Sequence, residues 1–331
     1  MIDHLPIFPI IIPLIAAPLC ALFRHSLIPW SILIITTWSS FASSLVLLYN
    51  ISSHSTIIYQ MGGWVAPIGI EYRVDLLNAF IMVLVSGIAA IVAVYARQSV
   101  EQEIDRGRQH IYYSAFLLCL TGLLGISVTG DAFNVYVFLE ISSLASYAIV
   151  SVGRDSRALK AAFSYLIMGT IGATFILIAI GMMYMMTGTL NMADLAERLP
   201  DVKNTRTIQT AFAFLSVGLT LKIALFPMHS WLPNVYAYAP SVTTIFLSAT
   251  STKVSLYIFL RFFYGIYGAD YAFSRLNIND LLLPMGIVGI FVATIVAIFQ
   301  TDLKRLLAYS SIAQIGYIIV GLSTATVSGL T

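Results

Sequence analysis

Long apolar runs recur along the whole chain and are separated by short polar stretches. Within each run the apolar residues are continuous and do not alternate with polar ones, which excludes the strands of an outer-membrane barrel and favours helices. A helix of about 20 apolar residues is long enough to cross the hydrocarbon core of a bilayer. Ten such spans are predicted, over residues 5–23, 28–49, 76–96, 110–129, 131–150, 161–187, 207–227, 240–264, 281–299 and 303–323. The pattern therefore predicts an all-α polytopic membrane protein with about ten transmembrane helices.

Three of the segments between the spans are long enough to form structure of their own. Residues 51–75 place a Gly-Gly pair and a proline between two β-prone pieces, which predicts a hairpin outside the bilayer. Residues 97–109 are rich in charge and predict a loop. Residues 188–206 predict a short amphipathic helix at the membrane interface, with Asn191 as its N-cap and a turn at Pro200.

Composition strengthens the membrane assignment. The chain has 331 residues, of which 59% are hydrophobic and 10% are charged. A typical soluble domain is about 45–50% apolar and about 25% charged. So little polar surface excludes a water-soluble enzyme, a nucleic-acid binder and a disordered segment. The two cysteines lie in apolar runs without metal-ligand spacing, and the sequence contains no nucleotide, flavin or iron–sulfur motif, so no metal and no cofactor are expected.

Basic residues are distributed unevenly between alternate loops. One set of loops carries nine lysines and arginines and the other carries six. The positive-inside rule places the first set in the cytoplasm. We therefore expect a multi-pass protein of the cell inner (plasma) membrane with its N-terminus on the non-cytoplasmic side. The first apolar run lacks a basic region before it, so it is expected to be the first span and not a signal peptide.

Three charged residues fall where neither a loop nor a span end can hold them. Glu140, Lys222 and Lys253 each lie near the middle of an apolar stretch. A charge at the bilayer centre costs at least about 2.5–3.5 kcal/mol on insertion scales. A buried ion pair between Glu140 and Lys222 that only holds helices together is one explanation, but two lysines against one glutamate leave a charge over. Ionisable groups at this depth are typical of proton relays, and we favour that interpretation.

The span that contains Lys222 is expected to be discontinuous. In the stretch TLKIALFPMHSWLP, Pro227 and Pro233 each remove a backbone hydrogen bond. Broken helices with an ionisable residue at the midplane are typical of transporters. His229 follows the break and is a further candidate for the relay because imidazole exchanges protons near neutral pH. The alternative is a histidine that only makes structural hydrogen bonds.

A group of hydroxyl-bearing residues follows Glu140 in the same span. These are Ser142, Ser143, Ser146 and Tyr147. Their hydroxyls can hydrate a proton relay, or they can simply bond backbone carbonyls within the helix. The sequence leaves both alternatives open.

Five longer stretches carry a family resemblance. They are YQMGGWVAPIGIEYRVDLLNAF (59–80), GDAFNVYVFLEISSLASYAIV (130–150), LKIALFPMHSWLPNVYAYAPS (221–241), TKVSLYIFLRFF (252–263) and DLKRLLAYSSIAQIGYI (302–318). Together and in this order they resemble the antiporter-like membrane subunits of Mrp-type cation/proton antiporters, of respiratory complex I and of membrane-bound hydrogenases. The GGW segment and the PNVYAYAP ending are most similar to the D-type subunit of the Mrp antiporter.

The resemblance implies a role for each central charge. Glu140 matches a glutamate that modulates a neighbouring lysine, Lys222 matches the central proton carrier on a broken span, and Lys253 matches a lysine that passes protons along a polar axis. Their position near the middle of apolar runs indicates the same three residues without the resemblance. Complex I members often carry a histidine where this chain has Tyr236, which leaves His229 as the local histidine candidate.

The resemblance also implies an architecture. Family members usually have about fourteen spans, which include two inverted five-helix repeats. We expect residues 1–109 to hold three N-terminal spans with the hairpin over 51–75, and residues 110–264 to form a complete first repeat. Residues 265–331 are expected to be the start of a second repeat that is truncated at Thr331.

The expected function is that of a proton-translocating subunit of a multi-subunit monovalent cation (Na⁺)/proton antiporter. Its expected partners are other membrane subunits, the lipid bilayer, protons and Na⁺, with no nucleic acid. The alternative is a proton-pumping subunit of a redox complex, either NADH:quinone oxidoreductase or a membrane-bound hydrogenase. Only in that case would the chain be part of an enzyme. An inactive structural scaffold is a third hypothesis, and an independent small-molecule carrier is disfavoured because no substrate-shaped set of polar residues is visible.

Overall fold

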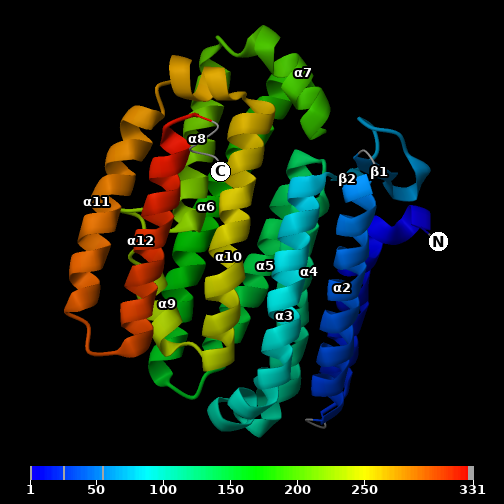
Figure 1. Cartoon of the computed structure of the whole chain (residues 1–331), viewed down its shortest axis with the longest axis vertical. Helices are drawn as coiled ribbons and strands as arrows, with labels where there is room; N and C mark the ends of the chain where they lie inside the picture. The colour runs from blue at the N-terminus through cyan, green and yellow to red at the C-terminus, as the bar shows by residue number, and fades with distance from the viewer. Residues whose placement is uncertain (1, 25–26, 54–55, 327–331) are drawn as a thin grey trace. The chain divides into compact units, whose positions relative to one another are not determined.

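The computed structural model describes residues 2–24, 27–53 and 56–326. Small parts of the predicted hairpin segment (54–55) and of the predicted C-terminal segment (327–331) lie outside these residues. Most of the described chain is helical (Figure 1). Among the described residues, two strands form one small sheet.

Nine helices of the described chain are long and apolar enough to cross a membrane. They are built on α1 (Phe8–Leu22), α2 (Leu27–Ser53), α3 (Leu76–Glu103), α4 (Gln109–Val128), α5 (Ala132–Ser151), α6 (Ser156–Thr187), α10 (Ser241–Leu260), α11 (Asn279–Ile298) and α12 (Leu303–Ser323). The tenth expected span corresponds to α8 (Arg206–Ile223), which ends at a break before the short α9 (Leu232–Tyr238). The predicted fold class, an all-α polytopic membrane protein with a discontinuous helix near Lys222, is confirmed.

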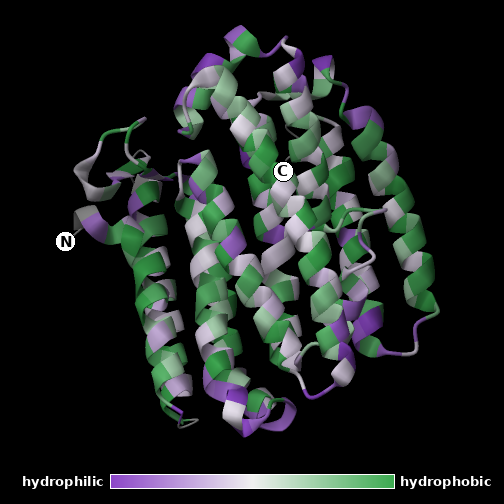
Figure 2. Ribbon diagram, turned by 180° about the vertical axis from the view of Figure 1, so that it is seen from behind, coloured by the Kyte–Doolittle hydropathy of each residue, from purple (hydrophilic) through white to green (hydrophobic). Residues whose placement is uncertain are grey.

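The outer surfaces of the helices are apolar. Figure 2 shows hydrophobic residues along the lengths of the helices and hydrophilic residues gathered in the connecting segments. Large apolar side chains are well exposed, among them Ile91 (71%), Phe291 (65%) and Ile298 (73%). Water would penalise such a surface, whereas lipid would not. The distribution fits helices that are surrounded by a bilayer.

The chain forms two compact units, each made of two stretches of sequence. One unit comprises residues 1–166 and 238–254, and the other comprises residues 167–237 and 255–331. Helices α6 and α10 therefore contribute to both. The division into segments 1–109, 110–264 and 265–331 stays a prediction.

Helix α4 is the core of the first unit. It packs against α1, α3 and α5, and most of its side chains are buried. Two glycines bring it close to α5: a Cβ on Gly122 would lie 2.6 Å from the backbone nitrogen of Ser142, and a Cβ on Gly125 would lie 2.4 Å from the Phe138 ring. A side chain at Gly122 would meet the backbone of α5 and push it away, and a side chain at Gly125 would displace the Phe138 ring. The glycines of α4 thus fix the position of α5, the helix that contains Glu140.

The hairpin predicted within residues 51–75 is present. Strands β1 (Ile57–Gln60) and β2 (Glu71–Val74) pair antiparallel, and the 3-10 turn η2 (Met61–Gly63) follows β1 directly. The hairpin contacts the turn between α4 and α5, where Gly130 N–H donates to the Glu71 carbonyl at 2.9 Å. The next residue, Asp131, caps α5 by accepting from Asn134 N–H at 2.7 Å. The hairpin and the cap together hold the start of α5.

Helix α3 extends further than the sequence predicted. Residues 97–103 were expected in a charged loop, but they form the last turns of α3. These residues are mostly good helix formers, and Arg97 pairs with Glu101 one turn later at 3.0 Å. The connection to α4 is consequently short and contains the turn η3 (Arg106–Arg108).

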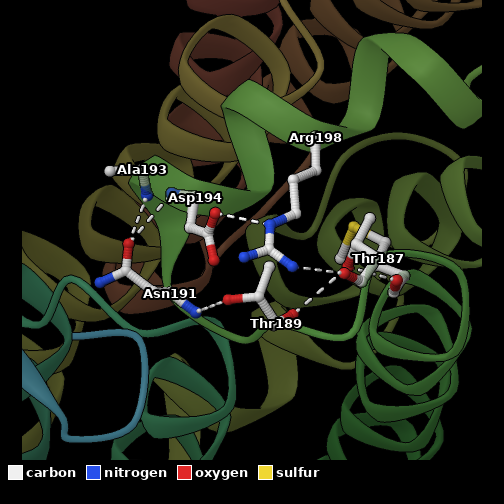
Figure 3. A network of polar contacts seen from close by, with 7 residues as sticks. Thr187, Thr189, Asn191, Ala193, Asp194 and Arg198 are labelled. Atoms are coloured by element: carbon white, nitrogen blue, oxygen red, sulfur yellow. Dashed lines mark hydrogen bonds and ion pairs between the residues drawn. The ribbon is translucent and has the colours of Figure 1, made fainter.

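In the second unit, α11 and α12 run side by side (Figure 1), and helix α7 (Met192–Val202) precedes α8. The predicted N-cap of α7 is confirmed, because Asn191 Oδ1 accepts from the N–H groups of Ala193 and Asp194 at 3.0 and 3.1 Å. Asp194 also pairs with Arg198 at 2.7 Å, and Arg198 donates to the Thr187 carbonyl at 3.2 Å (Figure 3). This network fixes α7 to the end of α6.

The other end of α7 differs from the prediction. A turn was expected at Pro200, but the helix continues to Val202 with the proline in its last turns. A proline this close to the end removes only one helical hydrogen bond, so the helix tolerates it. The buried Leu195 and Leu199 lie on its apolar face, and the helix packs against the π-helical turn η4 (Arg261–Ile266). Protein therefore covers the leucines of this amphipathic helix.

Candidate functional site

Glu140 lies near the middle of the 20-residue helix α5. Its Oε1 atom is buried and has no hydrogen-bond partner among the described residues. Tyr136, Ser143 and Tyr147 share its helix face, because they lie four residues before, three after and seven after it. Glu140 thus lies in a stripe of polar side chains along one face of α5.

The hydroxyls that follow Glu140 divide between the two alternatives left open by the sequence. Ser142 donates to the Leu139 carbonyl at 2.9 Å, and Ser146 donates to the Ser142 carbonyl at 2.7 Å. These two serines therefore bond the backbone of their own helix. The hydroxyl of Tyr147 behaves differently, because it is buried and completes no hydrogen bond among the described residues.

Lys222 lies in the last turn of α8 and is only 8% exposed. The helix ends immediately after it, at Ala224, which adopts a left-handed conformation with φ 61° and ψ 41°. Ala224 N–H donates to the Leu221 carbonyl at 3.2 Å, and Leu225 N–H donates to the Thr220 carbonyl at 3.0 Å. This pair of bonds is the Schellman pattern of a helix C-terminus. The predicted break is therefore present, but a left-handed alanine, three residues before Pro227, ends the helix.

The helix end affects both the electrostatics and the packing around Lys222. The C-terminus of a helix carries a partial negative charge, which favours a lysine in the last turn. The carbonyl of Leu221 also accepts from the indole N–H of the buried Trp231 at 3.3 Å, so the chain folds back over this end. Gly172 of α6 lies beside the stem of Lys222, since an added Cβ there would be in van der Waals contact with its Cγ at 3.7 Å.

His229 lies in the connection between the break and α9 and is half-buried. Its ring stacks on Phe226 with a centroid distance of 5.3 Å and meets the edge of Tyr309 of α12 at 6.4 Å. Its Nδ1 atom is buried and has no hydrogen-bond partner among the described residues. Nearby, Arg305 of α12 donates to Asn234 of α9 at 3.2 Å, which connects the second half of the broken helix to α12.

Lys253 lies near the middle of the 26-residue candidate span Ser241–Ile266. Its Nζ atom donates to the Ser248 carbonyl of the same helix at 2.5 Å. A lysine that turns back to its own backbone keeps its ammonium group solvated at a depth where water is scarce. The mid-span position agrees with the depth that the apolar run predicts.

One residue that holds the start of α10, the helix that contains Lys253, was not predicted from the sequence. The charged segment predicted Glu103 in a loop, but this residue ends α3 and its Oε2 accepts from Ser241 N–H at the start of α10 at 2.9 Å. The two residues are 138 positions apart. No local pattern signals such a contact, because the acceptor and the helix that it caps meet only in the folded chain.

The four predicted site residues are shared between the two compact units. Glu140 and Lys253 belong to the first unit, and Lys222 and His229 belong to the second. Among the described residues no group of three or more His, Cys, Asp or Glu side chains could hold a metal ion. All four side chains are ionisable, so each can bind and release a proton.

Comparisons with known proteins agree on one family. Residues 129–331 match the family model described as NADH:quinone oxidoreductase/Mrp antiporter, TM. The chain is 41% identical to the NADH-quinone oxidoreductase subunit N of Desulforudis audaxviator (strain MP104C), over 100% of this chain and 66% of that protein. It is 28% identical to the D-type subunit of the Na(+)/H(+) antiporter of Alkalihalophilus pseudofirmus, over 98% of this chain and 64% of that protein.

A solved structure extends the comparison to three dimensions. The archaeal membrane-bound sulfane sulfur reductase, a respiratory membrane complex, contains a chain that is similar with a TM-score of 0.89 and 32% identity. The match covers 97% of this chain and 65% of that one. The chain thus spans 64–66% of the length of these relatives.

Proposed function

This chain belongs to the NADH:quinone oxidoreductase/Mrp antiporter transmembrane family, and we propose that it is a proton-translocating subunit of a multi-subunit monovalent cation (Na⁺)/proton antiporter. The resemblance drawn from the sequence motifs is confirmed at the level of the family. The chain is an antiporter-like membrane subunit of the type found in Mrp and complex I-like assemblies.

One observation carries the proposal: three ionisable side chains interrupt helices that are otherwise apolar. Glu140 and Lys253 lie near the middle of their spans, and Lys222 lies at the break after α8. Such placement is expensive in a membrane and is typical of ion and proton pathways. A discontinuous helix beside one of the charges adds to this, because broken helices recur at the binding sites of transporters.

In the proposed relay a proton resides on Lys222 and leaves it for Lys253. The Lys222 ammonium becomes a neutral amine, and the Lys253 amine becomes an ammonium, so that one proton and one charge move. In this relay the carboxylate of Glu140 favours the charged form of the lysines by Coulomb attraction, which is strong at low dielectric. His229, on the chain just after the break, exchanges protons with water at the mouth of the pathway.

We extend the proposal to the partners of the chain, its membrane orientation and the coupled cation. The relatives that are named as antiporter and oxidoreductase subunits are parts of larger assemblies, so we infer that other membrane subunits complete the pathway. We infer a plasma-membrane location, an N-terminus on the non-cytoplasmic side, and Na⁺ as the coupled cation. The loop charges support this orientation, with nine basic residues in one set of loops against six in the other.

A second candidate function has its own support. The 41% identity to an NADH-quinone oxidoreductase subunit N and the similarity to a respiratory complex favour a proton-pumping subunit of a redox complex. In that case the chain is a part of an enzyme without itself carrying the redox centres. The same three charges would then move protons that are driven by electron transfer.

The two candidates differ in what drives the proton. The test uses the intact complex, purified with its native partners and reconstituted in vesicles that enclose a pH-sensitive dye. A Na⁺ gradient imposed without any reductant is expected to drive proton flux, with choline in place of Na⁺ as the control. Flux that requires NADH or another electron donor, and that ignores the Na⁺ gradient, contradicts the antiporter proposal and supports the redox complex. The identity of the co-purified subunits distinguishes the two candidates independently, because antiporter subunits are expected in one case and subunits with redox centres in the other.

A further inference from the structure

Tyr147 continues the polar stripe of α5 towards α6. It lies seven residues after Glu140, which is about two helical turns. Helical side chains point back towards the N-terminus, so the Tyr147 ring leans towards the level of Glu140. Its hydroxyl approaches Ser143 without completing a hydrogen bond among the described residues. Glu140 Oε1 and Tyr147 Oη are thus two buried oxygens that share a helix face and retain hydrogen-bonding capacity.

Tyr165 of α6 meets Tyr147 directly. The two rings are in an edge-to-face contact with a centroid distance of 4.6 Å and an interplanar angle of 81°. Tyr165 is only 7% exposed. Its hydroxyl is hydrogen-bonded to Ser251 of α10 and to Ser146 of α5. A single tyrosine hydroxyl therefore connects the helix that contains Glu140 to the helix that contains Lys253, and all of these residues belong to the first compact unit.

The far end of this connection leads to Lys253. Ser251 lies three residues after Ser248, so both lie on the same face of α10. The Lys253 Nζ atom donates to the carbonyl of that same Ser248 at 2.5 Å. The serine that is hydrogen-bonded to the Tyr165 hydroxyl and the carbonyl that accepts from Lys253 Nζ thus lie about one turn apart on α10.

We propose that Tyr147, Tyr165 and Ser251 form a hydroxyl bridge that conducts protons between Glu140 and Lys253. The inference rests on the proposed function and deepens it, because it adds the step by which Glu140 and Lys253 exchange a proton inside the first unit, in series with the transfer from Lys222. A hydroxyl both donates and accepts a hydrogen bond, so it can take a proton on its oxygen while it releases its own. Hydroxyl groups of this kind therefore relay protons without ever becoming charged.

The transfer balances in protons and charge. Glu140 starts as a carboxylic acid and Lys253 as a neutral amine. The carboxyl O–H bond breaks, each hydroxyl oxygen gains one proton and loses another, and a new N–H bond forms on Lys253. The product is a carboxylate on Glu140 and an ammonium on Lys253, with every hydroxyl neutral again but reoriented. The reverse transfer resets the bridge.

A purely structural role for the tyrosines makes a different prediction. If the rings only pack α5 against α6, phenylalanine preserves that packing and proton flux is unchanged. If the hydroxyls relay protons, removing a single oxygen interrupts the bridge. The substitutions Tyr147→Phe and Tyr165→Phe separate the two roles, and Ser251→Ala interrupts the bridge from α10 without touching a ring.

The matched control is Tyr112→Phe. Tyr112 is a buried tyrosine of α4 in the same unit, and its hydroxyl contacts Thr243 at 3.0 Å. Losing that hydroxyl costs a buried hydrogen bond of the same kind, outside the bridge. Assembly and thermal stability of each variant complex are measured first, so that flux is compared only between complexes of matched content.

The experiment measures proton flux through the reconstituted intact complex in H₂O and in D₂O. Tyr147→Phe, Tyr165→Phe and Ser251→Ala are each expected to lower flux about tenfold and to change the solvent isotope effect, because a positioned proton-transfer group is worth at least that much. Tyr112→Phe is expected to keep both. Bridge variants with unchanged flux, or an equal loss in Tyr112→Phe, overturn the inference. Lys222→Ala is measured alongside. Unchanged proton flux in Lys222→Ala refutes the proposed function itself. If Lys222→Ala loses flux while the three bridge variants keep theirs, only the bridge is refuted.

Discussion

The carboxylate of Glu103, in the last turn of α3, accepts a hydrogen bond of 2.9 Å from the backbone N–H of Ser241, the first residue of α10. Its other oxygen accepts from Ser99 at 2.8 Å, and Ser99 in turn accepts from Val242 N–H at 3.3 Å. The first N–H groups of a helix have no partner within the helix, and they favour negative charge. Two residues of α3 thus cap the helix that contains Lys253.

Removing this cap should destabilise α10. Glu103→Ala is expected to lower the free energy of unfolding by about 1–2 kcal/mol, as the loss of an N-cap does. Glu103→Gln retains an acceptor oxygen and is expected to restore most of that loss. Thermal unfolding of the purified complex at matched detergent measures both. Glu101→Ala is the control, since its pair with Arg97 is about half exposed and is worth about 0.3–0.5 kcal/mol. Equal losses in Glu103→Ala and Glu101→Ala would contradict the capping role.

The left-handed Ala224 at the end of α8 permits a second test. Ala224→Gly relieves a conformational cost of about 1–2 kcal/mol but loses a buried methyl group worth about 0.8 kcal/mol, so its stability is expected to stay within about 1 kcal/mol of the original protein. Ala224→Val adds a branched side chain at φ 61° in a fully buried position, and it is expected to cost more than about 2 kcal/mol. Denaturant or thermal unfolding ranks the two variants. Valine that is tolerated as well as glycine would show that the break has another geometry.

The glycines of α4 test how α5 is positioned. A Cβ on Gly122 would meet backbone atoms of α5, 2.6 Å from Ser142 N and 2.7 Å from Phe138 O, whereas a Cβ on Gly125 would meet only the Phe138 side chain. A side chain can rotate away and a backbone cannot, so Gly122→Ala is expected to cost more stability than Gly125→Ala, with overpacking of about 1–3 kcal/mol. Proton flux should fall with it, because Glu140 moves with α5.

The control for this series is Gly181→Ala in α6, where an added Cβ meets no atom within 4 Å. Alanine is a better helix former than glycine by about 1 kcal/mol, so this variant is expected to be at least as stable as the original protein. A loss at Gly181 that equals the loss at Gly122 would mean that the close approach of α4 and α5 is not what the substitution disturbs.

Asp131, just before α5, predicts a dependence of stability on pH. Burial raises the pKa of this carboxyl above its ordinary value of 3.8, although the N–H groups of Asn134 and Phe133 act in the opposite direction. A raised pKa means that the folded chain binds the proton more tightly than the unfolded chain. The carboxyl therefore favours folding at low pH, and that contribution is lost as pH rises through the raised pKa.

Asp131→Asn tests this dependence, because asparagine is an equally good N-cap and does not ionise. The melting temperature of the variant relative to the original protein is expected to rise between pH 4 and pH 7. A relative melting temperature that falls over this range would mean that the charged carboxylate stabilises the start of α5.

Much of the fold was predictable because apolar runs report membrane spans directly. The position of Asn191 before an amphipathic segment was enough to identify its cap. The end of α8 was placed less well, because the prolines mark where a helix cannot continue, whereas the observed end depends on a left-handed alanine that no local pattern requires. The last turns of α3 were missed for a related reason: charged residues suggest a loop, but these are also good helix formers.

The candidate site was predictable to the extent that it depends on depth. Glu140 and Lys253 stand out because a charge in an apolar run is conspicuous in a sequence. Glu103 and Tyr165 do not stand out, because their roles depend on contacts with α10, which is distant in the chain. A glutamate in a charged loop and a tyrosine in an apolar span are both unremarkable until the helices that they contact are known.

If the buried charges carry the proton, a complex without the Lys222 amine cannot conduct it. The measurement is Na⁺-driven proton flux through the reconstituted intact complex with Lys222→Ala, at matched content of assembled complex, with Glu140→Ala and Lys253→Ala beside it. We expect a complex that assembles normally and loses proton flux in all three variants, since each removes an ionisable group from the pathway. Flux that persists unchanged in assembled Lys222→Ala would contradict this expectation and would make the three charges structural, with any transport running through a partner chain.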